Sequence, residues 1–200
     1  MRMAPNPRSG GRLPYDASRI NARSSAVLIL LYPHNGELYL PLTLRATYDG
    51  MHSGQVSLPG GRSEEGDCNI AATALREANE EVGVDAQSVS VLGALTPLFV
   101  FVSNNLVTPI VGWSEQRPNF ATNTREVAQL LEVPIRALCD PQNHIVESWQ
   151  LRDRTADVPF YRVNGQQVWG ATAMILSEFL SLPAWSNFAR MPEPDRSSQR

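Results

Sequence analysis

The sequence predicts a single domain of the α/β class, of the α+β type, in which helices flank one mixed sheet. Two Asn-Gly pairs, at residues 35–36 and 164–165, join apolar stretches of strand length and are typical of β-hairpins. Residues 69–82 and 171–180 instead repeat apolar residues at helical spacing. Strands and helices follow one another without strict alternation, which favours a mixed sheet over a purely parallel one.

The composition excludes several classes of protein. With 200 residues, 42% hydrophobic and 18% charged, the chain is neither disordered throughout nor a rod. Its net charge of −3 argues against nucleic acid as a partner, and its longest apolar run is too short to span a membrane. All 17 basic residues are arginine, which excludes lysine chemistry. The two cysteines are too few for a disulfide scaffold, so we expect a reducing, cytoplasmic location.

The two ends differ in composition from the part between them. Residues 1–24 carry five arginines and one acid, similar to a mitochondrial transit peptide, but their three prolines would break the helix that such a peptide needs. We therefore interpret residues 1–24 as a flexible arm, whose role in targeting stays open. Residues 25–190 form the folded domain, and residues 191–200 form a flexible tail.

The elements begin with a hairpin of residues 26–32 and 38–44, in which Pro41 predicts an edge or a bulge. After a glycine-bearing loop, residues 69–82 form a helix that ends at Gly83, a typical C-cap.

Strands dominate the second half. Residues 89–95 form one strand, and residues 97–113 form two strands joined near residues 103–105. Residues 125–133 begin as a short helix that stops before Pro134. The hairpin around the second Asn-Gly pair and the last helix complete the domain.

The helix at residues 69–82 has an acidic face opposite its apolar stripe. At about 100° per residue, Glu77, Glu80 and Glu81 fall within one arc. These carboxylates repel one another, and they lie at the negative end of the helix dipole. Two interpretations stay open from the helix alone: a solvated acidic face, or a site for Mg²⁺ or Mn²⁺, which prefer oxygen ligands.

The loop before this helix favours the second interpretation. Gly60 and Gly61 let the backbone approach a metal ion or a diphosphate closely. Asp67 lies in the same acidic stretch, and Arg76 stands beside Glu77, where it can orient a carboxylate.

Together these residues resemble the Nudix box. The family pattern is a glycine, five residues, a glutamate, seven residues, and then R-E-U-x-E-E-x-G-U, in which U is bulky and apolar. Gly61 takes the first position, and "REANEEVGV", residues 76–84, takes the last part, with Ala78 in place of a bulkier residue. Asp67 stands at the first glutamate position, and eight residues separate it from Arg76.

Upstream residues resemble one branch of this family, the coenzyme A pyrophosphatases, which also shows the longer spacing. Its signature is L-L-T-x-R-(S/A), three residues, R, three residues, G, three residues and F-P-G-G; here the chain reads "PLTLRATYDGMHSGQVSLPGG". The residues in register are Leu42, Thr43, Arg45, Ala46, Gly54, Pro59, Gly60 and Gly61. Pro41 and Leu58 replace a leucine and a phenylalanine, and Gly50 replaces the second arginine, a lost phosphate contact.

The resemblance implies a Nudix-type α/β/α sandwich and a metal-dependent hydrolase. The reaction would cleave coenzyme A or its derivatives at the diphosphate, to 3',5'-ADP and 4'-phosphopantetheine. The implied ligands of Mg²⁺ or Mn²⁺ are Glu77, Glu80 and Glu81, with Asp67 as a further or water-mediated ligand. Arg76 would orient Glu77 or Glu81.

The implied substrate contacts are Arg45, Arg62, Gly60 and Gly61. A carboxylate would act as general base: Glu77 is the candidate inside the motif, and a glutamate elsewhere is the alternative. A homodimer is compatible with the family.

Two other functions stay open. The first is a Nudix hydrolase of another nucleoside diphosphate derivative, such as NADH, ADP-ribose, a dinucleoside polyphosphate or an oxidised nucleotide; the arginine lost at Gly50 keeps this one open. The second is a catalytically silent, nucleotide-binding module. The glutamates Glu77, Glu80 and Glu81 argue against it, since such a module does not need three acids that repel one another.

Overall fold

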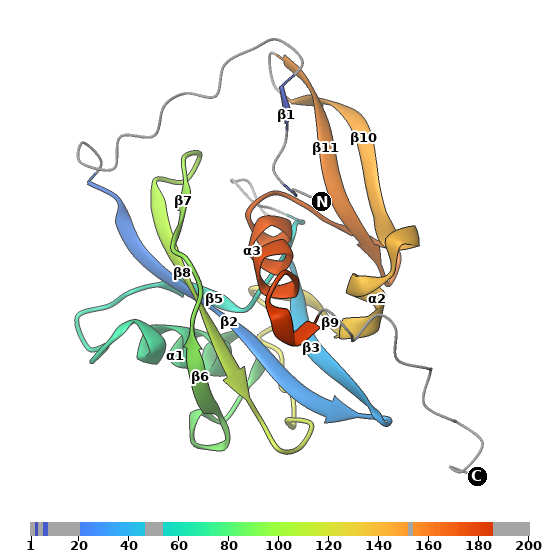
Figure 1. Ribbon diagram of the computed structural model, residues 1–200. Helices are drawn as coiled ribbons and strands as arrows, with labels where there is room; N and C mark the ends of the chain where they lie inside the picture. Colours follow the sequence, from blue (N-terminus) through green and yellow to red (C-terminus); the bar gives the residue numbers. More distant parts are fainter. Residues whose placement is uncertain (1–2, 4–5, 8–20, 47–53, 152–153, 186–200) are drawn as a thin grey trace.

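The computed structural model describes residues 3, 6–7, 21–46, 54–151 and 154–185 (Figure 1). Within them the chain forms two β-sheets and three α-helices in one domain. Short 3₁₀ turns lie at Ala86–Ser88, Pro141–Asn143 and Pro183–Trp185.

The larger sheet is mixed, as predicted. Its strands in spatial order are β4 (Val56–Ser57), β3 (Glu37–Arg45), β2 (Arg23–His34), β8 (Asn105–Trp113) and β6 (Ser90–Ala94). Three more strands pair with these: β5 (Gly60–Arg62) with β2, β7 (Leu98–Val100) with β8, and β9 (Val127–Pro134) with β3. Strands β2 and β8 run parallel, and the other described pairs of this sheet are antiparallel.

The first hairpin has the predicted turn. Asn35 and Gly36 both have positive φ angles, 50° and 76°, as a type I′ turn requires. Strand β3 pairs with β2 at residues 37–39 and with β4 at residues 43–44. Pro41 lies between these two sections and is paired on the other side of β3 with Glu132 of β9, so the predicted edge is open on one side only.

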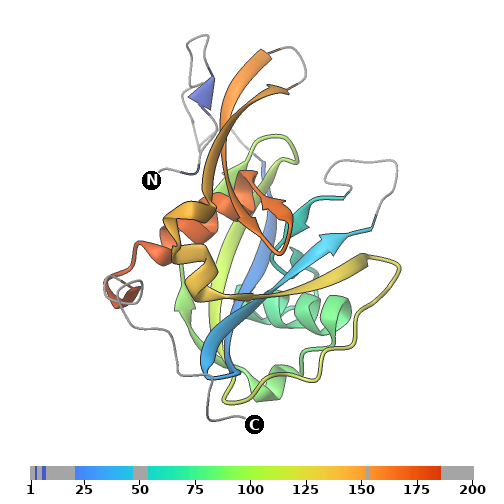
Figure 2. The same ribbon diagram turned by 90° about the vertical axis from the view of Figure 1, so that its right-hand side faces the viewer.

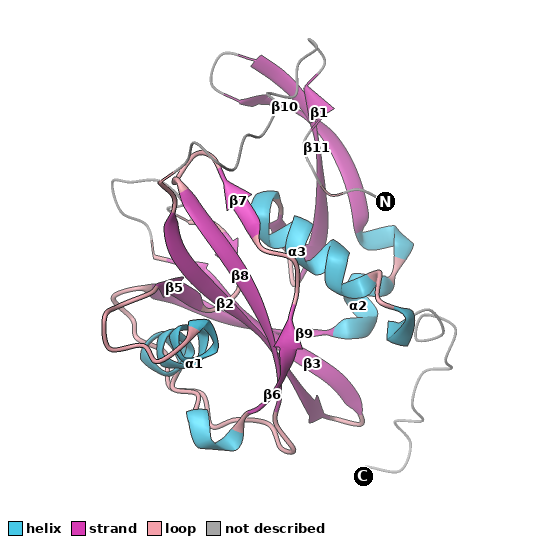
Figure 3. Ribbon diagram, turned by 60° about the vertical axis from the view of Figure 1, so that its left-hand side comes forward, coloured by secondary structure: helices cyan, strands magenta, loops and turns pink. Residues whose placement is uncertain are grey.

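Alternate residues of β2 build one core on each face of the sheet. Ala26, Leu28 and Leu30 are buried under helix α1 (Ile70–Val82). Ile29 and Leu31 belong to the core on the other face, which contains buried residues of helix α3 (Gly170–Leu180). Helices thus cover both faces, and the predicted α/β/α sandwich is confirmed (Figure 3).

The smaller sheet is formed mainly by strands that follow β9 and the short helix α2 (Ile135–Cys139) in the chain. Its strands are β10 (His144–Leu151), β11 (Arg154–Val163), β12 (Gln166–Val168) and β1 (Asn6–Pro7). Strands β11 and β12 turn at Asn164 and Gly165, both at positive φ, so the second predicted hairpin is confirmed. Val163 and Val168 are buried in the core shared with α3.

The helix predicted at residues 125–133 is wrong, because this stretch mostly forms strand β9. Its register places Leu131 opposite Leu42 and Val133 opposite Leu40, and all four side chains are buried. Periodicity is ambiguous over so short an apolar segment, and pairing with a neighbouring strand decides the outcome. Strand β10 (His144–Leu151) and helix α2 (Ile135–Cys139) were not predicted from the sequence.

The predicted arm and tail are described only in part. Met3 is buried in the core shared with α3, and β1 pairs with β11. The other residues of the arm up to residue 20, and the tail at residues 191–200, lie outside the described residues, so their flexibility stays a prediction. In the part of the chain that is described, no helix has the length and hydropathy to cross a membrane.

Candidate functional site

Helix α1 positions the three glutamates of the motif. Asn69 caps its first turn, where the side-chain oxygen accepts a hydrogen bond from the Ala72 N–H at 2.9 Å. Gly83 ends the helix in the left-handed conformation, with φ 72°, and its N–H donates to the Asn79 carbonyl at 2.9 Å. The predicted helix and its C-cap at Gly83 are therefore confirmed, while Asn69, predicted as the first helical residue, is the N-cap.

The two glycines bring strand β5 against this helix. The Gly60 N–H donates to Oε2 of Glu81 at 3.3 Å. A Cβ atom on Gly60 would lie 2.3 Å from the Ala26 carbonyl oxygen, and one on Gly61 would lie 2.4 Å from the Glu77 carboxylate. Real Cβ atoms do not come so close to other heavy atoms. Gly60 meets fixed backbone and needs glycine, whereas a Cβ at Gly61 would displace the Glu77 carboxylate. The carboxylates of Glu77 and Glu81, called here the buried pair, therefore lie directly against the backbone.

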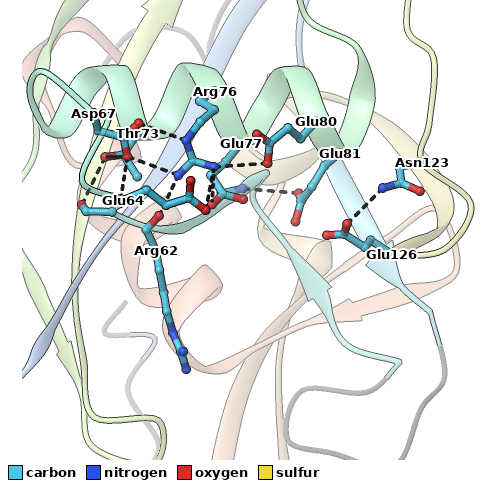
Figure 4. A network of polar contacts seen from close by, with 12 residues as sticks. Arg62, Glu64, Asp67, Thr73, Arg76, Glu77, Glu80, Glu81, Asn123 and Glu126 are labelled. Carbon is cyan, nitrogen blue, oxygen red and sulfur yellow. Dashed lines mark hydrogen bonds and ion pairs between the residues drawn. The ribbon is translucent and has the colours of Figure 1, made fainter.

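Arg76 is the centre of a polar network along α1 (Figure 4). Its Nε and Nη2 donate to the two oxygens of Asp67 at 3.0 and 3.2 Å. Its Nη1 donates to Glu77 at 3.1 Å and to Glu80 at 3.2 Å. Its Nη2 also donates to the Arg62 carbonyl oxygen at 2.8 Å, which joins the helix to β5. One guanidinium therefore orients two of the motif's glutamates.

The fold places the Asp67 carboxylate beside Arg76 and not beside the carboxylates of the buried pair. Its Oδ2 also accepts hydrogen bonds from Thr73 Oγ1 at 2.8 Å and from the Glu64 N–H at 2.9 Å. Arg76 is the largest of the causes that hold the pKa of Asp67 well below its ordinary range. Protein donors thus already surround both oxygens, and Asp67 is placed to fix Arg76.

Nearby positive groups compensate only part of the negative charge of the buried pair. The side chains of Glu77 and Glu81 are 15% and 4% exposed, whereas that of Glu80 is 53% exposed. Burial raises the pKa of Glu77 against the opposing effect of Arg76. Burial raises the pKa of Glu81 to about 7, against the opposing effects of Arg45 and the Gly60 N–H. A cation beside these carboxylates would stabilise their charged forms and lower both pKa values.

Arg45 lies beside Glu81, at the end of β3. Its Nη1 is 3.8 Å from Oε1 of Glu81, and its buried Nε has no hydrogen-bond partner among the described residues. A buried donor without a partner costs free energy, which a bound acceptor such as a phosphate oxygen would recover. The side chain of Arg62, in contrast, extends away from the carboxylates (Figure 4). Of the two arginines predicted to bind phosphate, the structure brings only Arg45 to the buried pair.

A fourth carboxylate, Glu126, faces this site and was not predicted (Figure 4). The preceding loop folds back onto α1, where the Asn123 N–H donates to the Glu81 carbonyl at 2.9 Å. The Asn123 side chain donates to Oε1 of Glu126 at 3.0 Å and holds it there. The charge of Glu126 is one of the causes that raise the pKa values of Glu77 and Glu81. No spacing in the sequence links Glu126 to the motif, so nothing could have indicated it.

The described side chains do not form a ready-made metal cage. Among these residues, no group of three or more His, Cys, Asp or Glu is arranged to hold a metal ion. The donor set nevertheless fits a hard divalent cation, because it consists of carboxylate oxygens whose mutual repulsion and burial are only partly compensated by the protein.

Comparison with known proteins gives one family. The family model described as the NUDIX domain matches residues 22–150. Nudix hydrolase 22, chloroplastic, from Arabidopsis thaliana is 36% identical over 167 residues, which cover 79% of this chain and 54% of that protein. The peroxisomal coenzyme A diphosphatase NUDT7 from Mus musculus is 37% identical over 125 residues, which cover 62% of this chain and 52% of that protein. The matches therefore span about half the length of these two relatives.

A solved structure shares the fold. The Nudix hydrolase RenU from M. smegmatis superposes with a TM-score of 0.51 at 21% sequence identity. The superposition covers 68% of this chain and 81% of RenU.

Proposed function

The chain belongs to the Nudix hydrolase family, whose members act on pyrophosphate bonds, and from this premise we propose that it cleaves the diphosphate of coenzyme A or its derivatives. The products would be 3',5'-ADP and 4'-phosphopantetheine. The observation that carries the proposal is the buried pair, Glu77 and Glu81, held against Gly60 and Gly61 with Arg45 alongside. The upstream signature and the similarity to the mouse coenzyme A diphosphatase support coenzyme A as the substrate.

The residues that would hold Mg²⁺ or Mn²⁺ are Glu77, Glu80 and Glu81, and Glu126 lies beside them with another role. The raised pKa values of the buried pair support this set, because a divalent cation would stabilise both charged forms. Asp67 is left out of the set, since its oxygens already accept hydrogen bonds from protein donors. When bound, the metal ion would neutralise charge on the diphosphate and lower the pKa of bound water.

The chain's own groups would bind the substrate and accept a proton. Arg45 would donate to a diphosphate oxygen from the partly exposed end of its guanidinium, which lies beside Glu81. Glu126 would take the proton from the attacking water, because it is exposed and is already oriented by Asn123. Arg76 would keep Glu77 and Glu80 in position through the transition state, and Asp67 would keep Arg76 in place. A homodimer and a cytoplasmic location stay predictions from the sequence.

The test is hydrolysis of a substrate panel with Mg²⁺ or Mn²⁺. The panel contains coenzyme A, acetyl-coenzyme A, NADH, ADP-ribose, a diadenosine polyphosphate and 8-oxo-dGTP, and the products are resolved by liquid chromatography and mass spectrometry. We expect 3',5'-ADP and 4'-phosphopantetheine from coenzyme A, with a clear preference over the other compounds. Preferred cleavage of another compound would refute the coenzyme A assignment, and cleavage of none would favour a binding module.

Two variants test the site itself. Glu77→Gln should lower kcat by about 100-fold or more, because it removes a charged oxygen ligand that the fold has desolvated. The matched control is Glu115→Gln, at an exposed position after β8, which should hydrolyse at the wild-type rate. Equal rates for both variants would show that the buried pair is not the site.

A further inference from the structure

The segment between β8 and β9, residues 114–126 and called here the β8–β9 loop, ends with Glu126. Near its end, the Ala121 and Asn123 N–H groups donate to carbonyls in the last turn of α1 at 3.0 and 2.9 Å, and the second of these carbonyls belongs to Glu81. Figure 2 shows the loop, in yellow-green, running along α1 before it returns as β9. The position of Glu126 beside the buried pair therefore depends on what holds this loop.

Four residues, called here the Arg117 cluster, attach the first part of the loop to the larger sheet; they are Arg117 and Phe120 of the loop, Tyr32 of β2 and Glu132 of β9. Arg117 bonds both carboxylate oxygens of Glu132, from Nε and from Nη2, each at 2.7 Å. The Tyr32 hydroxyl donates to Oε2 of Glu132 at 2.9 Å. The Arg117 guanidinium lies 5.4 Å from the centre of the Phe120 ring. The Phe120 ring in turn meets the Tyr32 ring edge to face, with centroids 5.6 Å apart, so the four contacts form a closed circuit.

The Arg117 cluster is more rigid than an ordinary ion pair on a surface. A planar guanidinium that bonds both oxygens of a carboxylate is fixed in orientation, whereas a single contact between two exposed charges constrains little. Tyr32 is fully buried in the core beneath α1, so the cluster is anchored in the interior. Phe120 packs against the same core, and the next residue is Ala121, which is bonded to α1. The cluster therefore fixes the chain directly before the segment that ends at Glu126.

A fixed loop matters here because a general base must lie within hydrogen-bond reach of the proton that it accepts. Residues 114–126, all of which the structure describes, form neither helix nor strand, so the backbone of the loop does not hold its own shape. Its position comes from its contacts with β2, β9 and α1. Loss of the contacts made by Arg117 would let Glu126 leave its place beside the buried pair for part of the time.

We propose that Arg117 is a positioning residue for hydrolysis, which acts through the β8–β9 loop on Glu126. The inference rests on the proposed function, in which Glu126 accepts the proton of the attacking water. Arg117 itself is bound to Glu132, and its effect on the reaction runs through the loop backbone to Asn123, whose side chain holds Glu126.

The first variant is Arg117→Met, which keeps an unbranched side chain and removes both bonds to Glu132. With the compound of the panel that wild type cleaves fastest, kcat should fall about three- to tenfold while KM stays unchanged, because Glu126 would be in place for a smaller fraction of the time. Arg117→Lys, which keeps the charge but cannot bond both oxygens in the same way, should give an intermediate kcat.

The matched control is Arg162→Met, because the surroundings of Arg162 resemble those of Arg117. Its Nη2 lies 3.1 Å from Oε1 of Glu147, and its guanidinium lies 5.6 Å from the centre of the Phe160 ring. This pair belongs to the smaller sheet and does not touch the β8–β9 loop. Arg162→Met should therefore keep the wild-type kcat.

A double variant gives the readout that a merely structural role would not move. In Arg117→Met/Glu126→Gln, kcat should equal that of Glu126→Gln alone, because a base that is already lost gains nothing from being positioned. A further loss of about three- to tenfold in the double variant would show that Arg117 does not act through Glu126. A wild-type kcat in Arg117→Met or in Glu126→Gln would likewise refute the proposal.

Hydrogen exchange of backbone amides, measured by NMR without substrate or metal, separates this proposal from the proposed function. In Arg117→Met the Ala121 and Asn123 N–H groups should exchange about three- to tenfold faster than in wild type. The Ser181 N–H, which bonds the Glu178 carbonyl at the end of α3, should exchange at the wild-type rate. If wild type cleaves a compound of the panel and the two loop amides keep their exchange rates in Arg117→Met, the role of Arg117 is refuted and the function stands. If wild type cleaves none, the proposed function fails and the catalytic role of Arg117 with it, while the exchange rates still decide whether Arg117 holds the loop.

Discussion

Replacing Glu81 by glutamine should make the metal-free protein more stable above neutral pH. Glu81 is almost fully buried, and its partners, Arg45 at 3.8 Å and the Gly60 N–H at 3.3 Å, only partly offset the cost of burying its charge. Glutamine has nearly the same shape and keeps an oxygen that can accept the hydrogen bond from Gly60. The substitution therefore removes the charge and little else.

The size of the effect follows from the pKa of Glu81. The folded state raises this pKa from 4.5 to about 7, a difference worth roughly 3 kcal/mol of stability. Since the folded state binds the proton more tightly than the unfolded chain, this stability is fully present below about pH 4.5. It is lost as the pH rises to about 7. Wild type should therefore lose up to roughly 3 kcal/mol from this group between pH 4.5 and 8.

The assay is urea unfolding in the presence of a chelator at several pH values between 4.5 and 8. The stability difference between Glu81→Gln and wild type should grow steadily in favour of the variant as the pH rises. Glu115→Gln, at an exposed position, should follow wild type at every pH. Added Mg²⁺ at pH 8 should raise the urea midpoint of wild type more than that of Glu81→Gln. An unchanged pH dependence in Glu81→Gln would refute the reasoning.

Three other substitutions test the supports of the site. Gly61→Ala places a Cβ atom 2.4 Å from the Glu77 carboxylate, so kcat should fall by about 100-fold, while circular dichroism should show an intact fold. Asp67→Asn removes the charge that holds Arg76, and kcat should fall about 10- to 100-fold; a wild-type rate would show that the network does not orient the glutamates. Asn69→Ala removes the helix cap and should cost about 1 kcal/mol in urea unfolding, with no change in KM.

Much of the fold could be predicted because its signals are local. The Asn-Gly turns at residues 35–36 and 164–165 depend on conformations that few residues adopt, and both formed hairpins. Helix α1 was predictable to within a residue, because its cap residues and apolar stripe lie within the segment itself. Strand β9 was predicted wrongly because its conformation depends on β3, which lies about 90 residues earlier in the chain.

The features of the site likewise divide into those that the motif predicted and those that depend on packing. The spacing of the motif placed Glu77, Glu80 and Glu81 on one helix face, and the structure keeps them there. The sequence treated them as equivalent, but packing buried Glu81, covered most of Glu77 and left Glu80 exposed. Asp67 and Arg76 stood nine positions apart in one motif, and only the folded loop showed that they bind each other.

The sequence by itself determined the family and the helix with its acidic face. These properties reside in spacing and in backbone conformation, which a short stretch of chain carries alone. Only the tertiary structure decided that Arg45 lies beside Glu81 and that Glu126 joins the site. The groups involved come from strands and loops far apart in the chain. Their proximity follows from the pairing of strands and from the packing of the loop against α1, and no local pattern records either.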